Sequence, residues 1–224
     1  MHFESTLLRN VPNIVHGFGT RSDPVPTPVL KNWVELRPTW NQVAGVEIAN
    51  VVRRNQICGD VDGFFTKTTN PIGVQAADCV PILCARNDGG MVAALHAGWR
   101  GTKAKIVERL AKTLLAQGED VKNWIAAIGP AIGACCYEFG ADGIEDFMKT
   151  FPEIEPDLIS PAERKLDLSA INQCELERVG FGRVDWIPEC TYCAMDPAKG
   201  AKFHSFRREG GGTRQWSIIG RLRA

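Results

Sequence analysis

Short uninterrupted apolar runs are the clearest pattern along the chain. Residues 80–84, 91–95 and 125–128 contain no polar side chain. Runs of this length between polar segments are typical of strands that are buried on both faces. Asn87-Asp-Gly-Gly90 lies between the first two runs and has the composition of a tight turn, so we predict that these two strands form a hairpin.

Apolar residues at helical spacing occur in three other segments. The pattern predicts one amphipathic helix over residues 102–117, which Gly118 terminates. A second helix is expected from about Asp142 to Lys149. A third follows Asp167, a good N-cap, and ends near Gly180.

Two proline-containing segments interrupt these elements. Residues 22–29 carry three prolines and are expected to form a loop or flap, and residues 151–156 a second loop. Strands and helices are mixed without strict alternation. We therefore predict an α+β fold with mixed β-sheets and flanking helices, in a single domain over residues 1–224.

Composition narrows the classes of partner. Lys and Arg together number 26, as do Asp and Glu, so no global charge attracts nucleic acid or an anionic membrane. No apolar stretch is long enough to span a bilayer, and the first ten residues lack the pattern of a secretory signal. We expect a cytoplasmic protein that binds a small-molecule substrate, with local arginines for any anion.

The eight cysteines are expected to be reduced thiols rather than a disulfide framework. Cys190-Thr-Tyr-Cys193 has the spacing of a redox or zinc pair, but the sequence has no second pair with that spacing. We therefore predict that this pair fills the core, and that the adjacent Cys135 and Cys136 do so as well.

Cys79 and His96 are the strongest candidates for chemistry, since each lies beside an apolar run where a strand gives way to a loop. A thiol and an imidazole form either a nucleophile with its base or two ligands of a zinc ion. Cys58, in Gln56-Ile-Cys-Gly-Asp60, would complete a Cys2His zinc set. Trp99 and Arg100, which follow His96, are suited to a flat ring and an anion.

Several longer phrases resemble the YfiH family, whose members are named multicopper polyphenol oxidoreductase (laccase), purine nucleoside phosphorylase and peptidoglycan editing factor. The resemblance runs in order from about residue 16 to residue 210. It is carried by His16-Gly-Phe-Gly-Thr-Arg21, Ala77-Asp-Cys-Val-Pro81, His96-Ala-Gly-Trp-Arg-Gly-Thr102, Gly129-Pro-Ala-Ile-Gly-Ala-Cys-Cys-Tyr-Glu138, Cys190-Thr-Tyr-Cys193 and Phe203-His-Ser-Phe-Arg-Arg-Glu-Gly210.

The resemblance implies an α+β fold in which sheets and helices are layered, and one zinc ion held by two histidines and a cysteine. Cys79 and His96 match two of these ligands, and Cys58 stands where the family has its other histidine. A Cys58 thiolate donates more charge than imidazole, so the metal would be a weaker Lewis acid.

For function, the resemblance implies a zinc-dependent purine nucleoside enzyme that cleaves adenosine, inosine or methylthioadenosine with phosphate and deaminates adenosine. Cys79, His96 and Arg100 are the expected catalytic residues. The expected substrate-binding residues are Arg21, Gln56, Trp99, Phe206 and Arg207.

Three alternatives remain open. The first is an amidase that edits cell-wall precursors, with Cys79 and His96 acting either through zinc or as nucleophile and base. The second is a copper-dependent polyphenol oxidase, for which four histidines are few. The third is a nucleoside-binding protein without catalysis.

Overall fold

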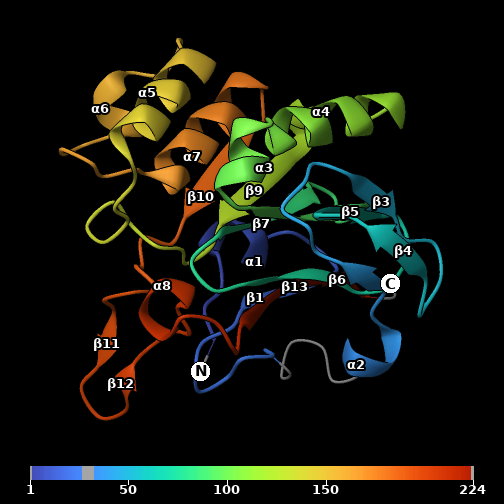
Figure 1. Ribbon diagram of the computed structural model, residues 1–224. Coiled ribbons are helices and arrows are strands. Elements are labelled where there is room, and N and C mark those ends of the chain that lie inside the picture. Colours follow the sequence, from blue (N-terminus) through green and yellow to red (C-terminus); the bar gives the residue numbers. More distant parts are fainter. Residues whose placement is uncertain (1, 27–32, 223–224) are drawn as a thin grey trace.

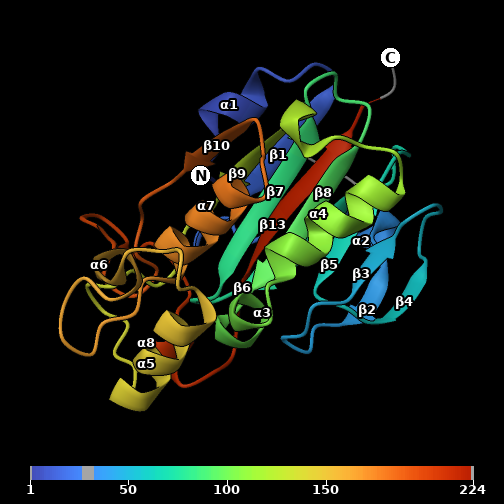
Figure 2. The same cartoon turned by 90° about the horizontal axis from the view of Figure 1, so that it is seen from above.

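A six-stranded mixed sheet lies at the centre of the computed structural model, which describes residues 2–26 and 33–222. Helices α3, α4 and α7 cover one face of this sheet, and a three-stranded antiparallel sheet packs on the other (Figures 1 and 2). The six-stranded sheet has the order β10 (Arg183–Trp186), β9 (Trp124–Ile128), β7 (Val80–Arg86), β8 (Val92–Ala97), β5 (Gly63–Thr66), β3 (Ile48–Asn50).

The other strands form smaller sheets. The three-stranded sheet has the order β1 (Ile14–Phe18), β13 (Gln215–Arg221), β6 (Ile72–Ala76), and the two-stranded sheets pair β2 (Thr39–Asn41) with β4 (Ile57–Asp60) and β11 (Met195–Asp196) with β12 (Gly200–Ala201). The helices are α1 (Thr6–Arg9), α2 (Trp33–Leu36), α3 (Trp99–Lys103), α4 (Ile106–Ala116), α5 (Ala141–Thr150), α6 (Pro156–Ile159), α7 (Leu168–Arg178) and α8 (Phe206–Glu209), with a 3₁₀ turn at Val121–Asn123.

The central strand β7 shows why its sequence is a continuous apolar run. Ile82 and Cys84 face the helices, whereas Leu83 and Ala85 face the three-stranded sheet, and all four are fully buried. Because side chains alternate along a strand, a strand covered on both faces needs apolar residues at every position. The predicted layered α+β architecture is confirmed.

Most of the predicted elements are confirmed. Strands β7 and β8 pair antiparallel with Ile82 opposite Leu95, which is the predicted hairpin. Helices α5 and α7 occupy the predicted segments, and the Asp167 carboxylate caps α7 by accepting a hydrogen bond from the Ala170 N–H at 2.9 Å. Residues 151–155 form a loop before α6, as predicted, and residues 27–29 of the proline-rich segment lie outside the described residues.

The single helix predicted over residues 102–117 is wrong. Lys105 has a left-handed backbone with φ of 60°, which ends α3 and begins α4. The apolar spacing did not reveal this break because the buried residues of α4, from Ile106 to Leu114, all follow it. Within the described residues, no helix has both the length and the apolar character that crossing a membrane requires.

His16 on β1 attaches the N-terminal segment to the three-stranded sheet. Its side chain is buried, and its Nε2 accepts a hydrogen bond from the Ser5 N–H at 2.8 Å. Burial disfavours the imidazolium and lowers the pKa of His16 to about 4. The folded protein therefore holds this histidine neutral.

A pH-dependent loss of stability follows from His16. As the pH falls below the ordinary pKa of 6.5, His16 takes up a proton in the unfolded chain. In the folded chain it stays neutral until about pH 4, so lower pH favours the unfolded state in this window. We expect the free energy of unfolding to fall through this window more steeply for the wild type than for His16→Gln, which keeps an acceptor but does not titrate. Urea unfolding at several pH values measures the difference, and parallel curves would contradict it.

Candidate active site

A cavity of about 740 Å³ lies beside the ends of β6 and β8. Its walls come from residues 40–44, 75–79, 96, 98–100, 132, 137, 168, 206, 207 and 214. The volume is within the range of small-molecule sites. Segments far apart in the sequence thus meet around one space, and Cys79 and His96 are both part of its wall.

A fully buried carboxylate fixes the orientation of His96. Asp62 Oδ1 lies 2.8 Å from His96 Nδ1. The same carboxylate accepts backbone N–H bonds from residues 43, 44 and 45 at 3.1, 2.9 and 2.7 Å. Because Nδ1 donates to Asp62, the other ring nitrogen of His96 remains available to the Cys79 thiol, and both side chains lie beside Gly98 on the cavity wall.

Burial and hydrogen bonding act in opposite directions on the pKa values of Asp62 and His96. Burial acts to raise the pKa of Asp62, but hydrogen bonds from His96 and the Gly45 N–H hold it below its usual value. Burial acts to lower the pKa of His96, but the Asp62 carboxylate and the Cys79 sulfur raise it to about 9. The site therefore favours a proton on His96 at neutral pH.

The residue before Cys79 has an unusual backbone. Asp78 has φ of 93°, a region that non-glycine residues rarely adopt. Its buried carboxylate accepts hydrogen bonds from the Thr191 hydroxyl at 2.7 Å, the Ser205 hydroxyl at 3.1 Å and the Arg207 N–H at 2.7 Å. These bonds hold the turn that presents Cys79 and tie it to the start of α8.

Gly98 leaves room for the thiol. A Cβ atom at this position would lie 3.1 Å from Cys79 Sγ and 3.6 Å from His96 Cε1. The close approach explains why the phrase that follows His96 has glycine here, whatever chemistry the pair performs.

Aromatic rings and cations line the rest of the cavity. The Arg100 guanidinium lies 4.4 Å from the centre of the Trp99 ring, and that of Arg207 lies 5.0 Å from the centre of the Tyr137 ring. Phe206 lines the cavity and is 55% exposed, so its ring is open to a ligand. The cavity therefore combines flat apolar surfaces with positive charge.

Six of the nine predicted site residues lie around this cavity: Cys79, His96, Trp99, Arg100, Phe206 and Arg207. The other three do not line it. Arg21 forms an ion pair with Glu209, and its N–H donates to the Lys202 carbonyl. Gln56 bridges the Asn50 carbonyl and the Val52 N–H, which closes the turn before β4.

Cys58, the expected third zinc ligand, lies on β4 and packs with the apolar residues between the two large sheets. Among the described residues, no third His, Cys, Asp or Glu joins Cys79 and His96 in a group whose ligand atoms lie within 4.8 Å of one another. A thiol and an imidazole backed by a carboxylate suit zinc, but a catalytic zinc site usually has three protein ligands. The described residues therefore do not complete the implied three-ligand site.

Sequence reasoning missed three residues that shape the site. Asp62 is one of two acidic residues, with Asp60, before an apolar strand, and nothing local connects it with His96, 34 positions away. Tyr137 lies within a phrase that resembles the family, but no property of its neighbours indicates that it lines a cavity. Trp40 follows a proline and a threonine in a polar stretch, so its place on the cavity wall had no signal in the sequence.

The fold and site define a class of mixed-sheet protein with a Cys–His pair held at an aromatic, cationic cavity. Residues 29–222 match the family described as multi-copper polyphenol oxidoreductase laccase. The chain belongs to this family, and the resemblance to YfiH proteins is confirmed.

Three relatives illustrate the similarity. The chain is 32% identical to the purine nucleoside phosphorylase of Deinococcus radiodurans, over 89% of this chain and 79% of that protein. It is 36% identical to adenosine deaminase RL5 from an unknown prokaryotic organism, over 67% of this chain and 58% of that protein. The crystal structure of the Bacillus licheniformis hypothetical protein YfiH shares the fold, with a TM-score of 0.81, 24% identity, and coverage of 94% and 93%.

The bonds of Asp78 generate a stability prediction. Thr191→Val removes a fully buried donor without changing the side-chain shape and leaves one Asp78 oxygen without that donor. We expect the free energy of unfolding to fall by about 1–3 kcal/mol. The matched control is Thr113→Val, because the hydroxyl of the half-buried Thr113 makes only a solvent-exposed bond to the Arg109 carbonyl on α4, and its loss should change stability by less than about 0.5 kcal/mol. Equal urea midpoints for the two variants would contradict the role of Thr191.

Proposed function

We propose that this protein is an enzyme of purine nucleosides that cleaves them with phosphate or deaminates adenosine. The observation that carries the proposal is the meeting of Asp62, His96 and Cys79 at a cavity that also has aromatic rings and arginines. The names of the relatives from Deinococcus radiodurans and of RL5 support the same substrate class.

The walls of the cavity account for binding. A purine is flat and apolar on its faces, so the exposed ring of Phe206 offers it a stacking surface. Phosphate is an anion, and Arg100, Arg207 and Arg214 bring positive charge to the same space. Trp99 contributes less to stacking than expected, because the Arg100 guanidinium covers its ring.

The His96 arrangement accounts for proton transfer. In phosphorolysis, the bond between ribose C1′ and purine N9 breaks while a phosphate oxygen bonds to C1′. The departing purine leaves more easily when it receives a proton, and His96 holds one beside the cavity with Asp62 stabilising the charge. His96 then regains a proton from solvent.

Direct assay tests this activity. Adenosine or inosine with phosphate should yield the free base and ribose 1-phosphate, and adenosine alone should yield inosine if the enzyme deaminates. Because general acid–base catalysis contributes about 10²–10⁴-fold, we expect His96→Ala to lose activity by that order. Cys79→Ala should lose it as well, whereas Cys174→Ala on α7, outside the cavity wall, should not.

The outcome that overturns the proposal is product formation no greater than that of Cys79→Ala, for all three nucleoside reactions. All variants need the same purification, so that traces of host enzymes contribute equally. Circular dichroism spectra that match the wild type show that lost activity reflects chemistry rather than unfolding.

Arg100 allows phosphorolysis and deamination to be separated. Its exposed guanidinium faces the cavity, and only phosphorolysis brings a phosphate there. We expect Arg100→Gln to raise the KM for phosphate by about tenfold or more, because a hydrogen bond to a charged group contributes about 1.5–3 kcal/mol. Deamination should change less. Arg109→Gln, which removes an exposed arginine of α4, is the control, and an equal effect on both variants would contradict the assignment.

Amide hydrolysis is a second candidate, and the spatial arrangement of Asp62, His96 and Cys79 favours it. In this arrangement a carboxylate orients a base beside a nucleophile, and such a mechanism requires no metal. Under this alternative, the nucleoside assays fail, and the protein instead releases an amino acid from a cell-wall precursor peptide in a reaction that needs Cys79.

Polyphenol oxidation by several copper ions draws little support from the histidines. Of the four, only His96 lines the cavity. His2 contacts Asp23 and Glu4, His16 accepts from Ser5, and His204 contacts Thr213. Since imidazole is the usual copper ligand, we do not propose this activity.

A further inference from the structure

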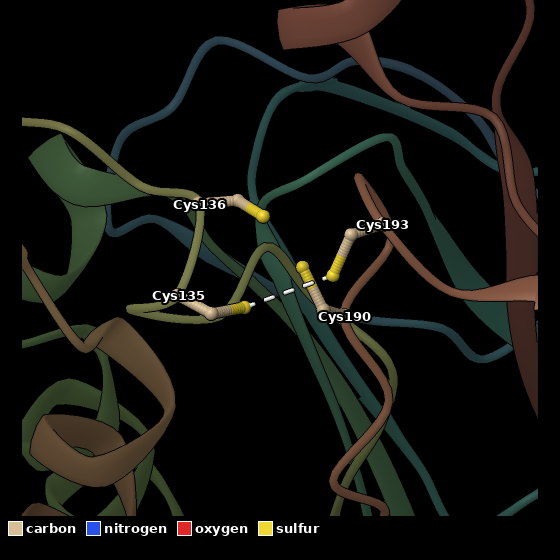
Figure 3. A group of neighbouring side chains, drawn as sticks. All are labelled: Cys135, Cys136, Cys190 and Cys193. Atoms are coloured by element: carbon tan, nitrogen blue, oxygen red, sulfur yellow. Dashed lines mark hydrogen bonds between the residues drawn. The ribbon is translucent and has the colours of Figure 1, made fainter.

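Four cysteines form a compact cluster away from the Cys79–His96 pair. The sulfur atoms of Cys135, Cys136, Cys190 and Cys193 all lie within 4.8 Å of one another, and Figure 3 shows the four side chains pointing toward a common centre. Cys135 and Cys193 are exposed, so the prediction that these pairs fill the core is wrong.

The parallel pairing of β9 with β10 explains how the cluster arises. Parallel neighbours end at the same edge of a sheet, so the segments that follow them leave side by side. The first segment carries Cys135 and Cys136, and the second carries Cys190 and Cys193. A bridge between Ala131 and Cys190, with the Thr191 N–H donating to the Ala131 carbonyl at 2.9 Å, keeps the two segments in register.

The sulfur spacing distinguishes a metal site from a disulfide. The Cys135 and Cys193 sulfurs are 3.8 Å apart. A disulfide requires about 2.05 Å. A zinc ion at about 2.3 Å from each of four sulfurs makes the edges of the tetrahedron about 3.8 Å long. The observed separation therefore matches the edge of a tetrathiolate zinc site.

A backbone N–H group links the two segments at the cluster. The Gly133 N–H donates to the Cys190 sulfur at 3.3 Å, so the segment that carries Cys135 and Cys136 directly contacts a sulfur of the other pair. Arg208 adds positive charge on the same loop, because its guanidinium donates to the carbonyls of Thr191 and Tyr192.

We propose that Cys135, Cys136, Cys190 and Cys193 bind one zinc ion in a tetrahedral, structural site. Four thiolates satisfy zinc and leave no open position, so this ion performs no chemistry on substrate. Binding converts thiols to thiolates and releases their protons to solvent. The site goes beyond the proposed function, because it uses neither Cys79 nor His96.

The position of the site indicates a structural role for the ion. Thr191, between the two ligands of one pair, donates its hydroxyl to Asp78, and Tyr137, which follows Cys136, lines the cavity. A zinc ion here fixes one segment that forms part of the cavity wall and a second that holds Asp78 in place. It also stabilises the folded chain, since the unfolded chain lacks the assembled site.

Metal analysis in a Cys79→Ser background tests this site without contribution from the cavity. We expect this protein, purified without added metal and desalted, to retain one zinc ion per chain. Adding Cys135→Ser and Cys193→Ser should reduce the zinc content at least tenfold, whereas adding Cys174→Ser should not. Absence of zinc in the Cys79→Ser protein, or equal zinc in both further variants, overturns the proposal.

Spectroscopy on the Cys79→Ser protein keeps the test valid even where the further variants fail to fold. X-ray absorption at the zinc edge should show four sulfur neighbours at about 2.3 Å. Cobalt substitution should give the intense sulfur-to-cobalt charge-transfer absorption of a tetrathiolate. Nitrogen or oxygen ligands at the zinc, or a Cys135–Cys193 disulfide in the freshly purified protein, would show that the cluster is not this site.

Discussion

The buried carboxylate of Asp62 is the constraint on which the candidate active site depends. A fully buried charge is tolerated only when hydrogen bonds surround it, and Asp62 obtains them from His96 and from three successive N–H groups of the loop after β2. One side chain thus sets the ring orientation of His96 and the position of a cavity wall. Asp78 is a second such constraint, because it joins the Cys79 turn to Thr191 and to α8.

The residues that support the site differ from those that are available to a ligand. Asp62 is fully buried behind the wall and Asp78 lines the cavity with its carboxylate occupied by three donors, whereas Cys79, His96 and the arginines line the ligand space. Positioning by saturated buried carboxylates limits the motion of the reactive groups, because any displacement leaves a buried charge without its donors.

Local patterns were sufficient to predict the elements that build the centre of the fold. The runs that became β7, β8 and β9 and the caps of α7 depend on neighbours in the sequence, and Cys79 and His96 lie beside those runs. The contacts that could not be predicted join residues far apart in the sequence. Nothing near Asp62 indicates His96, nothing near Asp78 indicates Thr191 at 113 positions away, and the two cysteine pairs meet only through the pairing of β9 with β10. Cys58 shows the reverse, since a match by sequence position did not bring its side chain to the cavity wall.

The strand order of the three-stranded sheet has a consequence for how the protein folds. Strand β13 lies between β1 and β6, although it follows both by more than a hundred positions along the chain. During synthesis, β1 and β6 therefore emerge long before the strand that joins them, and each exposes an edge in the meantime. Contacts of such long range make folding slow and leave strands open to wrong partners. The sheet that closes over β7 and β8 is complete only once residues 215–221 have joined it, so the central layer is shielded late in folding.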